Sequence, residues 1–139
     1  MNYAIVYWSR YGNNRKIAEK LSELLRPKGE VAVVVAADGL KLPEADVYIF
    51  SAAAEKFTVN SEMKALMNGL TGMEGKRYAI INTHALGFHN WLGRMDKLLS
   101  KSGMAKIAEL DFRVGAGTDR GEGLPAGWEG KLGEFAENL

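Results

Sequence analysis

YAIVYWSRYGNNRKIA, residues 3–18, begins with six apolar residues and continues with a pattern of a different period. The run Tyr3–Trp8 is rich in residues that favour strands, and its unbroken apolar character predicts a strand buried on both faces. Gly12 interrupts the pattern, and apolar residues then recur at helical spacing from Ile17 to Leu25. The stretch therefore predicts a strand, a tight turn and a helix, which is the unit that builds parallel sheets.

The same alternation continues along the remaining chain. Short apolar runs predict further strands at residues 31–35, 46–50, 77–81 and 107–114, and helical stripes follow at residues 63–70, 91–99 and 128–139. Residues 36–45 and 115–127 contain glycine and proline and predict loops. Five strands alternating with helices predict a single α/β domain over residues 1–139, with a parallel sheet covered on both faces.

In an open parallel sheet, ligands bind beyond the carboxyl ends of the strands, which here means residues 9–14, 51–58 and 82–91. The first of these segments resembles an anion site in its chemistry. Gly12 permits a tight turn, and the helix start that follows offers free backbone N–H groups to a phosphate. The spacing is neither GxxxxGK[ST] nor GxGxxG, which argues against a Walker A loop and a dinucleotide fingerprint.

This first loop resembles that of the flavodoxin family, which reads roughly T/S-x-T/S-G-N/T-T before a helix containing Ile/Val-Ala. The matching positions are Ser9, Gly12, Asn13, Ile17 and Ala18, whereas Tyr11 and Asn14 stand where the family has hydroxyl residues. The order of strands and helices matches over essentially the whole chain. The resemblance implies a flavodoxin-like three-layer α/β/α fold, a five-stranded parallel sheet of order 2-1-3-4-5, and bound FMN. It implies phosphate contacts from Ser9, Arg10, Tyr11, Gly12, Asn13 and Asn14.

The resemblance also implies that the second and third loops contact the flavin ring. The residues expected there are Ala52, Ala53, Ala54, Phe57, Thr83, His84, Ala85, Leu86, Gly87 and Phe88. Alternatives stay open for two of them: Phe57 packing under the following helix, and His84 exposed to solvent. Trp91 is expected in the core with Met95 and Leu98. The acidic residue that the family often has near the ring is missing from the third loop.

Composition excludes several other classes of protein. The chain has 139 residues and no cysteine, so disulfides, thiolate metal sites and cysteine nucleophiles are excluded. Its two histidines, five residues apart and without a nearby carboxylate, do not make a zinc set, and no GxSxG elbow is present. The formal net charge of +1 gives no support to nucleic-acid binding. The amino terminus does not resemble a signal peptide, and no apolar stretch approaches the roughly 20 residues of a membrane span, so we expect a cytoplasmic protein.

The near-neutral total conceals a segregation of charge. Residues 1–30 carry six basic and three acidic residues and residues 76–106 carry six against one, whereas residues 31–75 and 107–139 carry net charges of −3 and −4. Two of the three expected flavin loops thus lie in basic segments, and Arg10 either pairs with the phosphate or points into solvent. Because cations stabilise an anionic reduced flavin, we expect its second reduction to be easier than in the acidic electron-carrier flavodoxins.

These observations favour an FMN-binding redox protein that transfers electrons between protein partners, as a monomer or weak homodimer. A second hypothesis is a quinone-linked oxidoreductase of the protoporphyrinogen dehydrogenase type, because that family also has an Arg in its first loop. That family has a longer chain and an insertion that is not found here. A third hypothesis is a flavodoxin-fold binding module without flavin, which the departures at Tyr11 and Asn14 leave open.

Overall fold

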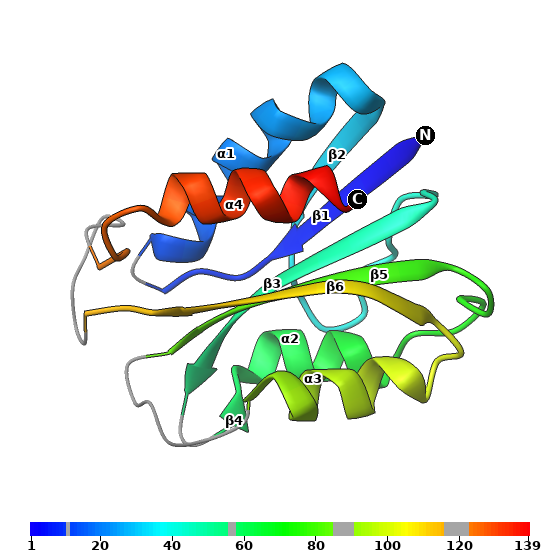
Figure 1. Cartoon of the computed structure of the whole chain (residues 1–139). Coiled ribbons are helices and arrows are strands. Elements are labelled where there is room, and N and C mark those ends of the chain that lie inside the picture. Colours follow the sequence, from blue (N-terminus) through cyan, green and yellow to red (C-terminus); the bar gives the residue numbers. More distant parts are fainter. Residues whose placement is uncertain (11, 56–57, 85–90, 116–122) are drawn as a thin grey trace.

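The computed structural model describes residues 1–10, 12–55, 58–84, 91–115 and 123–139, and its elements alternate along the chain (Figure 1). The strands are β1 (Asn2–Tyr7), β2 (Glu30–Val35), β3 (Val47–Glu55), β4 (Thr58–Val59), β5 (Arg77–His84) and β6 (Ala105–Arg113). The helices are α1 (Asn13–Leu25), the 3-10 turn η1 (Arg26–Lys28), α2 (Ser61–Asn68), α3 (Trp91–Ser100) and α4 (Trp128–Glu137).

The main sheet is parallel and has the order β2-β1-β3-β5-β6. Numbered without the short β4, this is the expected order 2-1-3-4-5, so the predicted flavodoxin-like fold is confirmed. Helices α1 and α4 cover one face of the sheet, and α2 and α3 cover the other (Figure 1).

Strands β1, β2, β3 and β5 contribute to two separate cores because their side chains alternate between the faces. Tyr3 and Ile5 of β1 are buried in the cluster beneath α1 and α4, whereas Ala4 and Val6 lie in the cluster beneath α2 and α3. A strand buried on both faces needs an unbroken apolar run, which explains why the first strand was recognisable from its sequence.

Strands β3 and β5 are longer than the sequence predicts. The predicted strands end at Phe50 and Ile81, but β3 continues to Glu55 and β5 continues to His84. Their added residues pair with each other, Ala52 with Asn82 and Ala53 with Thr83. The antiparallel strand β4 also pairs with the end of β3. Pairing with neighbouring strands thus extends β3 and β5 over alanine and polar residues, whose sequence pattern does not predict a strand.

Residues 36–46 form a connection without a helix between β2 and β3, as predicted. Leu40 and Leu42 of this connection pack against the cluster beneath α2 and α3. The loop therefore does part of the covering that a crossover helix would do. Among the helices that the structure describes, none has the length and apolar character needed to cross a membrane.

The pairing of β5 with β6 contains an irregularity of the kind made by a β-bulge. Tyr78 pairs with Lys106, but the next residue, Ala79, pairs with Ala108, so β6 has one extra residue at this point. Regular pairing then continues through Asn82 with Asp111. The irregularity sets which side chains of β6 lie next to the carboxyl end of β5.

Candidate functional site

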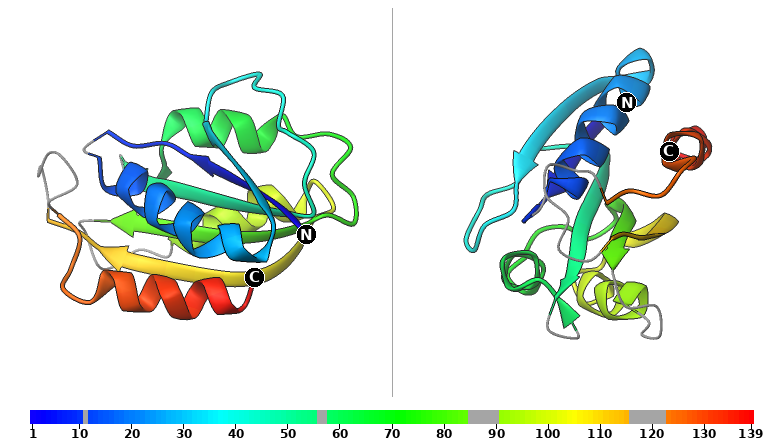
Figure 2. Two further views of the ribbon diagram at one scale, coloured as in Figure 1. Left: turned by 90° about the horizontal axis from the view of Figure 1, so that it is seen from above. Right: turned by 90° about the vertical axis from the view of Figure 1, so that its left-hand side faces the viewer.

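The carboxyl ends of β1, β3 and β5 lie at one edge of the sheet, because the three strands are parallel neighbours. The view onto this edge shows the start of α1 beside the ends of these strands (Figure 2, right). The structure therefore brings together the described parts of all three segments that the sequence analysis selected.

The start of α1 is built to leave its backbone N–H groups available. Gly12 is the N-cap residue in the left-handed conformation, with φ of 88°, and no side-chain cap bond is present among the described residues. The first turn also contains no acidic side chain. Such a helix start presents unsatisfied N–H groups and the positive end of the helix dipole.

Ser9 supplies a second feature that fits an anion at this position. Its Oγ is buried, and the described part of the structure gives it no hydrogen-bond partner. A buried hydroxyl without a partner is costly, and a phosphate oxygen would satisfy it. The residues of the first loop therefore fit the phosphate of FMN in both charge and hydrogen bonding.

Arg10 is exposed and lies against the ring of Trp8, with its guanidinium carbon 5.4 Å from the ring centroid. The charge of Arg10 also acts on the carboxylate of Glu62 at the start of α2. Its pKa lies below the ordinary value, chiefly because its own backbone N–H donates to it, and Arg10 adds to this effect. Whether Arg10 also contacts a phosphate stays a prediction.

The two asparagines of the first loop are engaged in different directions. Asn13 Oδ1 accepts a hydrogen bond of 3.2 Å from the backbone N–H of Gly123, which precedes α4. Asn14 is directed into the sheet, where Ser51 Oγ donates to its Oδ1 at 2.9 Å and its Nδ2 donates to Thr83 Oγ1 at 3.1 Å. Ser51 was not selected from the sequence. Its position as the first polar residue after an apolar strand is the signal that could have identified it.

The second segment is strand rather than loop at the positions that the structure describes. Ala52 is fully buried in the core beneath α2 and α3, so its side chain faces that core and not the site at the strand ends. Ala53 is half-buried, and its backbone exchanges hydrogen bonds with Asn60: the Asn60 N–H donates to Ala53 O, and the Ala53 N–H donates to Asn60 Oδ1. This contact fixes the end of β3 to the start of α2. The earlier placement of Ala52 and Ala53 in a loop was therefore wrong.

His84 is the last residue of β5 and is only 9% exposed, so the interpretation of an exposed loop histidine was wrong. Its Nδ1 lies 3.0 Å from Oδ1 of Asp111 on β6, and Asn82 Nδ2 donates to the same oxygen at 2.9 Å. A carboxylate is thus present beside the end of β5 although the third loop contains none. It was missed because it lies 27 residues further along the chain, and only the strand register brings it here.

Several predicted contacts lie outside the described residues. These are Tyr11, Phe57, Ala85, Leu86, Gly87 and Phe88, and the side chains of Ala54 and Trp91 are likewise not described. Their roles stay predictions. The expected core positions near Trp91 are better defined, since Met95 is fully buried and Leu98 packs against the same cluster.

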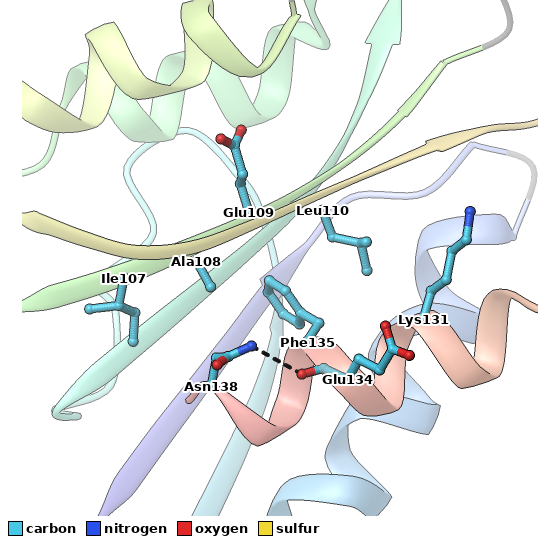
Figure 3. Close-up of a pocket in the computed structure, with 8 residues that line it drawn as sticks. All are labelled: Ile107, Ala108, Glu109, Leu110, Lys131, Glu134, Phe135 and Asn138. Atoms are coloured by element: carbon cyan, nitrogen blue, oxygen red, sulfur yellow. Dashed lines mark hydrogen bonds between the residues drawn. The ribbon is translucent and has the colours of Figure 1, made fainter.

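A groove of about 460 Å³ lies elsewhere, between β6 and α4 (Figure 3). Leu110 and Phe135 contribute its apolar surface, and Lys131 and Glu134 lie along α4 beside it. None of the predicted site residues lines this groove. Within the described ranges, no group of three or more histidine and acidic side chains could hold a metal ion.

A family model described as Flavodoxin matches residues 5–127 of the chain. Flavodoxin 2 of Bacillus cereus superimposes with a TM-score of 0.78 at 17% identity, covering 99% of this chain and 97% of that chain. A short-chain flavodoxin associated with a non-canonical PDU bacterial microcompartment gives 0.75 at 17% identity, covering 100% and 96%. The two-electron reduced flavodoxin of Megasphaera elsdenii gives 0.71 at 19% identity, covering 99% of each chain. No curated protein matches the sequence. At these identities the structural matches establish the fold alone.

Proposed function

Because the chain belongs to the flavodoxin family, we propose that it binds FMN at the carboxyl ends of β1, β3 and β5 and transfers electrons between protein partners. Support for the cofactor comes from the family and from a structural neighbour, a Fusobacterium nucleatum flavodoxin mutant described as bound to FMN, with a TM-score of 0.73 at 13% identity. The redox chemistry belongs to the flavin, while the protein holds and tunes it, so no side-chain acid or base is required.

The observation that carries this proposal is the start of α1, which has no side-chain cap within the described residues, next to the buried hydroxyl of Ser9, for which those residues provide no partner. A helix start without a side-chain cap leaves donors for phosphate oxygens, and Gly12 lets the backbone turn there. In the proposal Ser9 and the first backbone N–H groups of α1 hold the phosphate. Arg10 adds a charge-assisted contact from the rim.

The ring is assigned to the ends of β3 and β5. Ala53 and His84 lie at these strand ends, and residues 85–88 are assigned to the same role from the sequence. We place the protein in the cytoplasm as a single domain of residues 1–139, a monomer or weak homodimer. Its proposed partners are redox proteins, with no role for nucleic acid or membrane insertion.

The decisive experiment is a titration of the flavin-free protein with FMN and with riboflavin, which lacks the phosphate. We expect a yellow complex that quenches flavin fluorescence, with FMN bound more tightly than riboflavin. Arg10→Ala should weaken FMN binding about fivefold, as expected for an exposed charge pair worth about 1 kcal/mol, and leave riboflavin binding unchanged. Arg26→Ala at the far end of α1 removes the same charge and should change neither affinity.

Each alternative has its own outcome in this experiment. A colourless protein that ignores both flavins would contradict the proposal and support a binding module without flavin. Equal losses of FMN and riboflavin affinity in Arg10→Ala would mean that Arg10 is not a phosphate ligand. If the FMN complex oxidised protoporphyrinogen with a quinone acceptor, the protein would be an oxidoreductase rather than an electron carrier.

A further inference from the structure

Asn14 occupies the second position of α1 and is 2% exposed. Both ends of its amide are bound to the sheet: Oδ1 accepts from Ser51 Oγ at 2.9 Å, and Nδ2 donates to Thr83 Oγ1 at 3.1 Å. The two hydroxyl partners are buried as well, with exposures of 0% and 3%. A side chain so engaged lies beneath the first loop rather than on its surface.

The two partners belong to different strands. Ser51 lies in β3 directly before Ala52 and Ala53, and Thr83 lies in β5 directly before His84. One amide therefore connects the start of α1, where the phosphate is assigned, to the ends of both strands assigned to the ring.

We propose that Asn14 is a positioning residue that fixes the phosphate end of the flavin site relative to its ring end, and is not itself a phosphate ligand. This inference rests on the proposed FMN site. Ser9 Oγ, which has no partner in the described structure, is available to bind the phosphate. The amide of Asn14 instead holds the start of α1 against β3 and β5. Asn14, which stands where the family has a hydroxyl residue, thus has a different role in this chain.

Replacing Asn14 with alanine removes both hydrogen bonds and leaves two buried hydroxyls, Ser51 and Thr83, without their partner. Such a loss is costly in a site closed to water. The strand ends and the start of α1 would no longer be held at one spacing, so every ligand that contacts both regions should bind less tightly. Riboflavin and FMN should suffer alike, because the lost contact is to the protein and not to the phosphate.

The test compares the affinities of FMN and riboflavin for the wild type and Asn14→Ala at a temperature where circular dichroism shows both folded. We expect both affinities to fall by the same factor, about tenfold. The visible circular dichroism of bound riboflavin should also change. Leu24→Ala is a control in the same helix, away from the hydrogen bonds of Asn14. It should lower stability by loss of packing and leave the affinities for FMN and riboflavin unchanged.

Three results would overturn the proposal. A loss confined to FMN would make Asn14 a phosphate ligand, and unchanged affinities in a folded variant would make its role purely structural. A tenfold loss in Leu24→Ala would attribute the effect to stability alone and would count equally against the proposal.

Hydrogen exchange of the flavin-free protein separates this proposal from the proposed function. Asn14→Ala should increase amide exchange at residues 51–53 and 82–84 together with the start of α1, whereas Leu24→Ala should not produce this joint increase. If the wild type bound neither flavin, the proposed function would fail, and so would the role of Asn14 in flavin binding. The joint increase would then still show that Asn14 couples the three segments, and exchange confined to α1 would refute that coupling too.

Discussion

Tyr78 of β5 shows how a single buried side chain makes stability depend on pH. The residue is 2% exposed, and its hydroxyl donates to Oδ1 of Asp96 in α3 at 2.9 Å. Lys106 Nζ donates to the other carboxylate oxygen at 2.7 Å. Burial disfavours the phenolate, and the neighbouring Asp96 adds to this, so the pKa of Tyr78 is raised to about 12.

The raised pKa predicts a loss of stability at alkaline pH. The neutral phenol is favoured in the folded state, so its contribution is complete below pH 10.0, the ordinary pKa, and is lost as the pH rises to about 12. Tyr78→Phe should be less stable at neutral pH by about 1.5–3 kcal/mol, the worth of a hydrogen bond to a charged group. It should also lose less stability than the wild type over that alkaline range. Urea unfolding at a series of pH values tests this, and equal alkaline slopes for the two proteins would contradict it.

At this scale the sequence predicted residue types better than contacts. Ser9, Gly12 and Asn13 were recognisable because a loop between a strand and a helix has a characteristic local chemistry. Ser51 and Asp111 were not, because their partners lie in other elements and only the pairing of strands brings them together. Local spacing carries no information about such contacts.

Helices α1 and α4 begin in the same way, and this similarity permits a controlled test of the first loop. Their N-cap residues, Gly12 and Gly127, both have left-handed backbones, with φ of 88° and 80°. A side chain in this conformation costs about 1–2 kcal/mol. At Gly127 an added Cβ would meet no atom within 4 Å, so the cost there is backbone strain alone.

We therefore expect Gly12→Ala and Gly127→Ala to lower the free energy of unfolding by similar amounts, about 1 kcal/mol each. FMN affinity should fall in Gly12→Ala alone, because only that turn positions the N–H groups assigned to the phosphate. Thermal unfolding and fluorescence titration measure the two effects separately. Equal losses of FMN affinity in both variants would remove the first loop from the proposed site.

Element boundaries were predicted well where the sequence pattern and the pairing agree. The strand predicted at residues 31–35 is β2 except for one added residue, and the first strand ends one residue earlier than expected. The ends of β3 and β5 were missed because alanine, asparagine and threonine give no continuous apolar run. These missed residues are the ones that bring the second and third segments into the sheet.

Over the whole molecule, the segregation of charge predicts the redox behaviour of the proposed flavin. Arg10 favours an anionic reduced flavin, whereas Asp111, contributed by the acidic last segment, opposes it at the end of β5. The charge of each segment alone could not reveal this opposition, since strand order brings Asp111 beside His84. The absence of cysteine leaves a bound cofactor as the source of any redox role.

We expect the second reduction of bound FMN to be easier than in acidic electron-carrier flavodoxins, because the first loop is basic. Asp111→Asn should raise that potential further by removing a negative charge, and Arg10→Ala should lower it. Spectroelectrochemical titration measures the potentials directly. A wild-type couple as low as that of acidic flavodoxins would refute the expectation, as would a lowered potential in Asp111→Asn.

The extra residue in β6 changes which side chains of the strand share a face of the sheet. Lys106 and Asp111 are separated by an odd number of positions, which in a regular strand would send their side chains to opposite faces. Both side chains nevertheless lie on the face beneath α3. Lys106 donates a hydrogen bond to Asp96, and Asp111 contacts Asn82 and His84. Ile107 absorbs the odd position: a regular strand that kept Ile107 could not leave both Lys106 and Asp111 with their partners, whereas deleting Ile107 would make the separation even and keep both on this face. The irregularity at Ile107 thus lets the strand end beside His84 carry a negative charge while Lys106 keeps its contact with Asp96.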